Sequence, residues 1–127
     1  VRRRREFQRV GSGAQRNLPA SVLTLSDRKR LEVARAIATR PKLLLLDEAM
    51  AGLRPTECQP MIEFLREINR REGVTILLIE HVMRAVMALA QNVVVLHQGE
   101  VVARGAPEQI VREPAVLECY LGAGVQI

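Results

Sequence analysis

The sequence predicts an α/β fold with a mostly parallel sheet and flanking helices. Short unbroken apolar runs alternate along the chain with amphipathic segments of helical spacing. Apolar runs without polar alternation are typical of strands that are buried on both faces, as in parallel sheets. The last of these runs leads into a hairpin turn, so we expect one antiparallel pair at the end of the sheet.

The composition predicts one modest domain with an aliphatic core. The chain has 127 residues, of which 48% are hydrophobic and only 2% aromatic, and this length is enough for a single core. No apolar run is long enough to span a bilayer, and no apolar stretch follows the N-terminal arginines as it would in a signal peptide. Cys58 and Cys119 do not form a metal-spaced pair, which indicates reduced thiols in a cytoplasmic protein.

We expect residues 1–22 to form a basic, weakly ordered N-terminal segment, because glycines and a proline interrupt any helix there. The arginine run at residues 2–5 is accompanied by no nucleic-acid-binding motif and no interleaved aromatic residues. We therefore interpret it as a solvated surface and expect no nucleic-acid partner. The second segment, residues 23–127, is expected to contain the folded part.

The first helix is expected to begin at Ser26 or Asp27, which are both good N-cap residues, and to run to about Thr39. Pro41 ends it, since the residue before a proline is disfavoured in helical conformation. A buried strand over residues 43–47 then follows.

The second helix is expected over residues 57–71, capped by Thr56 and closed by Gly73. Another continuous apolar strand runs from Val74 to Ile79. After it, a short helix is expected to continue to about Ala90.

The end of the chain predicts a hairpin followed by two short helices. A third strand is expected over residues 93–96, and Gln98-Gly99 can form a tight turn into Val101-Val102. Pro107 and Pro114 each open a short helix, because proline is well tolerated at the first helical position.

Two carboxylates, Asp47 and Glu48, arrive together at the C-terminal end of the first buried strand. Ligands of open α/β sheets bind at that edge. Many nucleotide hydrolases hold a metal ion and a water-activating base there, side by side. The alternative interpretation is that acidic residues follow the strand only because the chain returns to solvent.

The motifs around this strand, in their order and spacing, resemble those of ATP-binding-cassette (ABC) ATPases over about residues 23–122. These motifs are Arg35-Ala36-Ile37 at the end of the signature helix, Leu43 to Glu48 as the Walker B strand with its catalytic glutamate, Gly52-Leu53 and Pro55 in the D-loop, and His81 as the switch histidine. Three segments, at residues 51–57, 80–87 and 114–122, are similar to the ATPase subunits of branched-chain amino acid importers. The resemblance implies a P-loop NTPase-like fold and ATP and Mg²⁺ as cofactors.

The resemblance also implies a role for each acidic and histidine side chain. Asp47 would hold Mg²⁺ through a water, since that ion keeps several waters in proteins. Glu48 would orient and deprotonate the attacking water, and His81 would contact the γ-phosphate and sense its loss.

The family's signature motif falls at residues 23–27 in this register and would bind nucleotide across a dimer through Thr24, Ser26 and Asp27. Thr24 replaces the usual serine and keeps its hydroxyl. Leu25 and Ser26 replace a middle pair that usually contains glycine, so close approach to a phosphate is impaired.

Two further positions depart from the family pattern. Ala49 stands where a proline is usual after the catalytic glutamate, and Arg54 stands where Asp or Asn is usual in the D-loop.

No phosphate loop of the form G-x-x-x-x-G-K-[ST] occurs in the chain. That loop supplies the amides and the lysine that cradle phosphates. The resemblance therefore covers only the C-terminal half of the ATPase domain, and the fold is expected to be incomplete. We expect the chain alone to bind ATP weakly or not at all, and to self-associate through unpaired apolar strand edges.

The function implied is that of the C-terminal portion of the ATP-hydrolysing subunit of an importer. The expected partners are a second ATPase subunit, identical or different, and membrane permease subunits. The expected location is the cytoplasmic face of the cell membrane. Two alternatives stay open: a catalytically silent dimerisation or docking module, and a fragment of a DNA-maintenance ATPase of the same class. The segments 80–87 and 114–122 argue against the second alternative.

Overall fold

The computed structural model describes residues 8–9, 13–15 and 17–121, and it divides the chain into two compact units, residues 1–85 and 86–127. Each unit is described by itself. Half of the segment expected to be weakly ordered, residues 1–7, 10–12 and 16, lies outside the described residues. Its described part contains two single turns of 3₁₀ helix, η1 (Gly13–Gln15) and η2 (Ala20–Val22).

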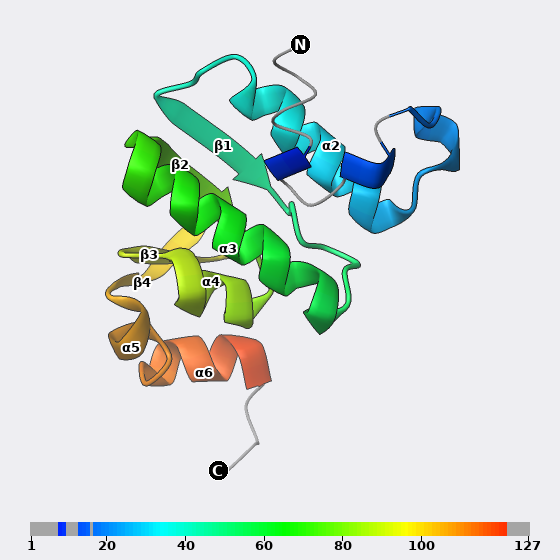
Figure 1. Ribbon diagram of the computed structural model, residues 1–127. Helices are drawn as coiled ribbons and strands as arrows, with labels where there is room; N and C mark the ends of the chain where they lie inside the picture. Colours follow the sequence, from blue (N-terminus) through cyan, green and yellow to red (C-terminus); the bar gives the residue numbers. More distant parts are fainter. Residues whose placement is uncertain (1–7, 10–12, 16, 122–127) are drawn as a thin grey trace. The chain divides into compact units, whose positions relative to one another are not determined.

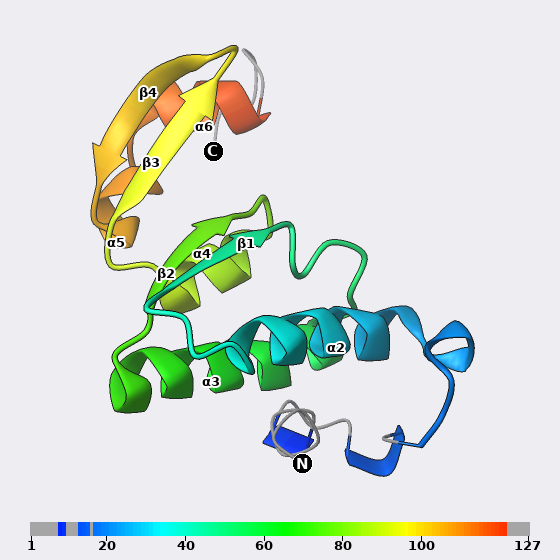
Figure 2. The same ribbon diagram turned by 90° about the horizontal axis from the view of Figure 1, so that it is seen from above.

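The first unit contains a parallel pair of strands with two helices on one side of it (Figures 1 and 2). The strands are β1 (Leu43–Asp47) and β2 (Thr75–Ile79), and Leu45 lies opposite Leu77 in their register. The two helices are α2 (Leu25–Ile37) and α3 (Pro55–Glu72). The connection from β1 to β2 through α3 is the crossover that a parallel pair requires. The predicted parallel pairing is thus confirmed.

The core of this unit is built around α3. Four of its side chains, which recur on one face of the helix, are at most 2% exposed: Met61, Ile62, Leu65 and Ile68. Leu44 and Leu46 of β1 are buried as well. Each such aliphatic side chain contributes roughly 1.5–3 kcal/mol by leaving water, so α3 supplies much of the stabilisation of the unit.

The prediction that β1 is buried on both faces is wrong for the described part of the chain. Leu43 and Leu45 are 52% and 64% exposed, and Leu77 and Ile79 of β2 are 57% and 59% exposed. These four side chains belong to one face of the strand pair, because alternate residues of a strand point to opposite sides. We call them the open face. The helices cover the other face, and no described element of the first unit covers this one.

Two predicted helix caps are also wrong. The N-cap of α2 is Thr24, whose hydroxyl accepts a hydrogen bond from the Asp27 amide, so the helix begins before Ser26. The N-cap of α3 is Arg54 rather than Thr56. Pro55 explains the earlier start, since its fixed φ suits the first helical position.

The closing residue of α3 agrees with the prediction: Gly73 caps the helix in left-handed conformation, at φ 67°. After β2, α4 (Met83–Leu89) follows as expected.

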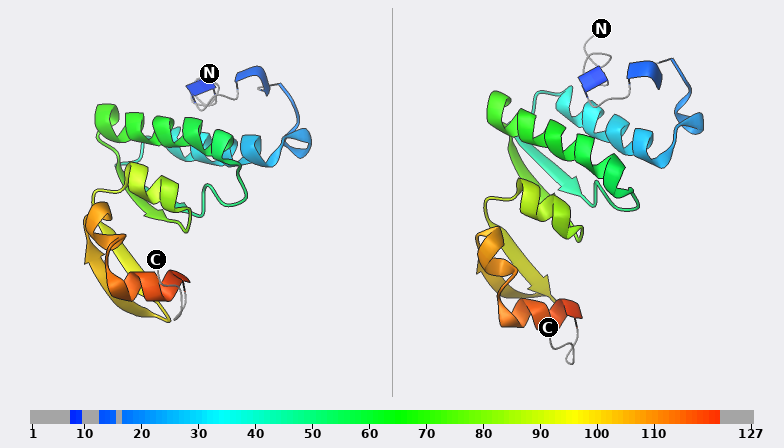
Figure 3. Two further views of the ribbon diagram at one scale, coloured as in Figure 1. Left: turned by 90° about the horizontal axis from the view of Figure 1, so that it is seen from below. Right: turned by 60° about the horizontal axis from the view of Figure 1, so that its bottom comes forward.

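The second unit is a hairpin with two short helices beside it (Figure 3). Its strands, β3 (Val93–His97) and β4 (Glu100–Gly105), are antiparallel. Gln98 and Gly99 both have positive φ, at 50° and 85°, which matches the tight turn expected from the sequence. The helices are α5 (Pro107–Ile110) and α6 (Pro114–Leu121), which both contact β4.

The small core of the second unit joins the hairpin to these helices through Val95, Ile110 and Val116. Among the described residues, β3 pairs with β4 and not with β1 or β2, so the strands form two sheets of two rather than the single sheet expected. The predicted mixture of parallel strands and one antiparallel hairpin is nevertheless present.

Candidate active site at the carboxyl end of the first strand

The candidate site lies where β1 ends, at the two carboxylates. Asp47 is the last residue of β1 and Glu48 follows it; both are exposed. The Glu48 amide donates to the Ile79 carbonyl at 2.9 Å, which extends the pairing of the strands by one residue. Glu48 then adopts φ 48°, in the left-handed region that side-chain-bearing residues rarely occupy. This turn directs the chain away from the sheet directly after the acidic pair.

His81 joins the site because β2 runs parallel to β1, so that both strands end at the same edge. Its Nδ1 lies 3.5 Å from the Glu48 Oε1, and the two side chains are 61% and 58% exposed. An imidazole and a carboxylate at this separation form an ion pair whenever the histidine is protonated. Both groups remain open to solvent and therefore to a ligand.

Lys29 is a residue of the site that the sequence analysis missed. Its ammonium on α2 donates to the backbone carbonyl of Glu48 at 3.0 Å. The Ala51 amide donates to the same carbonyl at 3.1 Å. These two hydrogen bonds help to hold Glu48 in its left-handed conformation. No local sequence signal indicates the lysine contact, because it depends on how α2 packs beside the turn.

Glu80 is a second missed residue. It stands directly before His81, and its Oε1 accepts a hydrogen bond from the Met50 amide at 2.7 Å. The sequence shows only an acidic residue at the end of a strand, which gives no indication of a partner thirty positions away.

The signature segment at the start of α2 is occupied by its own capping interactions. The Thr24 hydroxyl accepts from the Asp27 amide at 3.2 Å and donates to the Asp27 carboxylate at 2.8 Å. Ser26 is 7% exposed, and its hydroxyl has no hydrogen-bond partner among the described residues. A ligand at this segment would have to compete with the capping bonds of Thr24.

The D-loop residues lie against the signature segment of the same chain. Gly52 has φ 77°, and a Cβ placed on it would meet the Leu25 Cδ2 at 3.0 Å. The thiol of Cys58, which is buried in α3, approaches the Leu53 carbonyl at 3.8 Å. Burial raises the pKa of this thiol, and the nearby Glu80 carboxylate raises it further. The thiol therefore stays protonated and serves as a donor to the loop.

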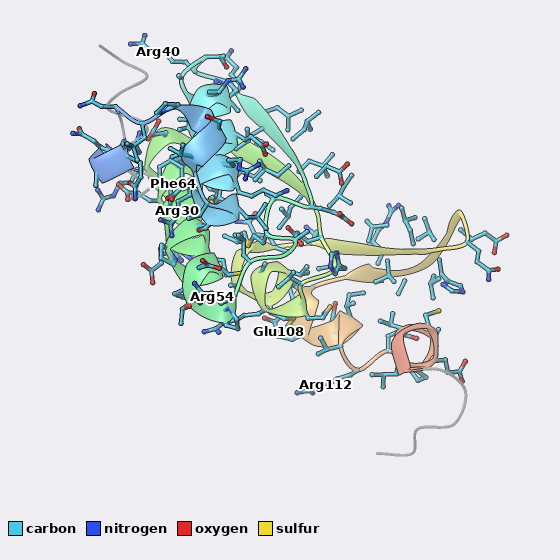
Figure 4. All side chains as sticks on the ribbon, turned by 90° about the vertical axis from the view of Figure 1, so that its right-hand side faces the viewer. Arg30, Arg40, Arg54, Phe64, Glu108 and Arg112 are labelled. Carbon is cyan, nitrogen blue, oxygen red and sulfur yellow. The ribbon has the colours of Figure 1, made fainter. Side chains whose placement is uncertain are left out.

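Arg54 ends the loop at the N-terminal end of α3 (Figure 4). Its amide donates to the Glu57 carboxylate at 2.8 Å, and its guanidinium forms an ion pair with Glu57 at 3.2 Å. These hydrogen bonds lower the pKa of Glu57, and the same carboxylate raises the pKa of Arg54. The pairing fixes the helix start that follows the loop.

The structure thus brings Glu48 and His81 together, and separately brings Gly52 against Leu25. No group of three or more metal-ligating side chains exists among the described residues. Asp47 alone offers one carboxylate to a cation. That suits Mg²⁺ at a nucleotide site, because this ion is usually bound through one or two carboxylates with waters and substrate phosphates.

Comparison with known proteins places these motifs in context. A family model described as a branched-chain amino acid ATP-binding cassette transporter matches residues 100–126. The high-affinity branched-chain amino acid transport ATP-binding protein LivG of Escherichia coli is 43% identical over 91% of this chain and 46% of its own length. BraF of Pseudomonas aeruginosa, described in the same words, is 42% identical over 84% of this chain and 42% of its own length.

The fold has matches among solved structures. A crystal structure of the ADP conformation of an ATP-binding cassette from an ABC transporter is 25% identical, with a TM-score of 0.84 over 95% of this chain and 49% of that chain. The chain therefore spans about half the length of the relatives it matches. Within the described part of the chain, no helix combines the length and apolar character that crossing a bilayer would require.

Proposed function

This chain is a relative of the ATP-binding cassettes of ABC transporters, and we propose that it forms the C-terminal part of the ATP-binding subunit of an importer for branched-chain amino acids. Nothing in the chemistry of the site selects an amino acid, so the substrate class rests on the named relatives. Their transport functions also favour an importer over the DNA-maintenance alternative. The subunit would couple ATP hydrolysis to transport.

The pairing of His81 with Glu48 is the observation that carries this proposal. The two side chains lie 3.5 Å apart at the edge where β1 and β2 end, and they remain exposed. In this arrangement Glu48 accepts a proton from the attacking water, and His81 orients the carboxylate and contacts the γ-phosphate. Asp47 supplies the carboxylate for Mg²⁺, which when bound would neutralise the developing phosphate charge.

Thr24, Ser26, Asp27, Gly52 and Leu53 would lie at the interface with a second ATPase subunit, with Ser26 and Asp27, which are 7% and 8% exposed, beneath its surface. The Thr24 hydroxyl caps α2 through Asp27. It would therefore have to turn from this cap to a phosphate of the partner's nucleotide. Two bonds to Asp27 compete with that contact, since the hydroxyl also donates to the Asp27 carboxylate.

The experiment that tests the proposal uses the complete cassette that contains this chain. Glu48→Gln is expected to retain ATP binding and to lower the hydrolysis rate by about 10²–10⁴, the usual contribution of a general base. Glu63→Gln changes an exposed carboxylate on the opposite side of α3 from its buried face and serves as the control. Hydrolysis at the normal rate in Glu48→Gln would overturn the assignment. A wild-type cassette that binds partner subunits but hydrolyses no ATP would identify a silent module.

The isolated chain should bind ATP weakly or not at all. Asp47 and Glu48 repel a triphosphate, and the chain has no phosphate loop to offset them. Titration of labelled ATP in the presence of Mg²⁺ measures this. Micromolar affinity for ATP would contradict the proposal that this chain holds only part of the nucleotide site.

The partners follow from the same proposal. A second ATPase subunit would complete the nucleotide site, and permease subunits would hold the pair at the inner face of the membrane. The isolated chain has an additional expected partner, a second copy of itself. The open face (Leu43, Leu45, Leu77 and Ile79) supports this, because exposed apolar patches of this kind favour association with another surface.

A further inference from the structure

The loop over residues 49–54, which follows the acidic pair, is held by two side chains outside it. Glu80, at the end of β2, accepts from the Met50 amide at 2.7 Å. Cys58, in the first turns of α3, approaches the Leu53 carbonyl at 3.8 Å. The Glu80 carboxylate lies close enough to Cys58 to raise the pKa of its thiol.

The Glu80 tie is partly buried. Met50 is fully buried, and Ala49 beside it is 6% exposed. The second carboxylate oxygen of Glu80 is also buried, and it has no hydrogen-bond partner among the described residues. Partial burial of a carboxylate costs free energy, and the hydrogen bond from the Met50 amide offsets part of that cost.

The position of Glu80 in the chain indicates what its hydrogen bond to Met50 does. Glu80 adjoins His81, and Met50 is two residues after Glu48. Glu48 occupies a left-handed conformation that is unfavourable for a side-chain-bearing residue and needs support from its surroundings. The Glu80–Met50 bond links the segment that carries the histidine directly to the segment that carries the strained glutamate.

We propose that Glu80 is a positioning residue, which fixes the Met50 amide and thereby sets the direction of the Glu48 carboxylate toward His81 and the attacking water. This inference rests on the proposed hydrolysis and adds to it a residue that touches neither nucleotide nor water. The acceptor oxygen, not the negative charge, performs the task. Glutamine keeps that oxygen in the same place, whereas alanine removes it.

The test compares Glu80→Ala and Glu80→Gln in the complete cassette. Glu80→Ala is expected to lower kcat for ATP by about tenfold or more, since misplacement of a reacting group by about 1 Å can cost 10²-fold. The KM for ATP should stay within about twofold, because no phosphate contact is lost. Glu80→Gln should restore most of the wild-type kcat. Glu63→Ala, which removes an exposed carboxylate from α3, is the matched control.

Hydrogen exchange of the Met50 amide provides a second readout that does not depend on activity. The amide should exchange faster in Glu80→Ala and stay protected in Glu80→Gln. An unchanged kcat in Glu80→Ala, or a Glu80→Gln variant as slow as Glu80→Ala, would overturn the inference while leaving the proposed function intact. An inactive wild-type cassette would instead overturn the proposed function. The exchange measurement would then still decide whether Glu80 holds the loop.

Discussion

The imidazole of His81 lies 3.5 Å from the carboxylate of Glu48, although the two residues are 33 positions apart in the chain. Their approach results from the parallel pairing of β1 with β2, which places the ends of both strands at one edge. The backbone at the glutamate turn has two side-chain contacts, since Lys29 donates to the Glu48 carbonyl and Glu80 accepts from the Met50 amide. Such backbone contacts restrict the conformations that Glu48 can adopt beside His81.

If this pair acts as a unit, its substitutions are expected to be non-additive. His81→Ala and Glu48→Gln should each lower kcat of the complete cassette strongly, and the double variant should be little slower than the slower single variant. Residues that perform one step together show this behaviour. A double-variant cycle on single-turnover rates measures it. If the rate reductions of the two single variants multiply in the double variant, the two residues act independently.

The open face predicts self-association of the isolated chain. Leu45→Lys places a charge at its centre and should shift the chain toward monomers at equal concentration, because apolar burial between copies is lost. Leu18→Lys alters a leucine that is similarly exposed, at 53%, and lies outside the strand pair, so it serves as the control. Light scattering gives the mass of each variant. A wild-type chain that is already a uniform monomer would refute this prediction.

The Arg54–Glu57 pair predicts an acid-dependent loss of stability. The pKa of Glu57 is lowered in the folded chain by its bonds to Arg54. Its contribution is therefore fully present above the unfolded carboxyl pKa of about 4.3 and is lost as the pH falls through the lower folded value. Glu57→Gln should melt below the wild type at neutral pH and together with it at strongly acid pH. Glu63→Gln should show no such convergence, and thermal melting followed by circular dichroism measures both.

Gly52 and Gly73 form a matched pair for testing the D-loop. Both have positive φ, and only Gly52 has a neighbour, the Leu25 side chain, within reach of an added Cβ. An alanine at either position should cost about 1–2 kcal/mol of unfolding free energy from the left-handed backbone. Only Gly52→Ala should also slow ATP hydrolysis by the complete cassette, because its added Cβ crowds the Leu25 side chain of the signature segment. Equal rates of ATP hydrolysis in the Gly52→Ala and Gly73→Ala variants would show that the D-loop conformation does not affect hydrolysis.

Much of the local structure was predictable because its causes are local. The span of β1 follows from an apolar run that ends in two carboxylates, and the hairpin turn follows from Gln98-Gly99. The helix starts were less predictable, since several capping residues stand in a row and packing selects among them. The structure has Thr24 as the N-cap, where its hydroxyl accepts from the Asp27 amide and donates to the Asp27 carboxylate, and Ser26 lies inside the helix.

The residues of the candidate site also fall into two groups, those that the sequence predicts and those that it does not. Asp47, Glu48 and His81 carry a motif that a reader of the sequence can recognise. Lys29 and Glu80 do not, because their partners are backbone atoms far away in the chain, and a backbone atom leaves no signature in the sequence. The exposure of one face of β1 could not be predicted from the sequence either. An apolar run indicates that burial of both faces is favourable, but not whether another part of the chain packs against each face.

The left-handed backbone at Glu48 has a consequence for how this position tolerates change. Glycine has no preference against that conformation, and asparagine accepts it more readily than glutamate does. Either substitution would relieve the turn while removing the carboxylate. A library screened only for folding should therefore drift away from glutamate at position 48, whereas one screened for ATP hydrolysis should keep it.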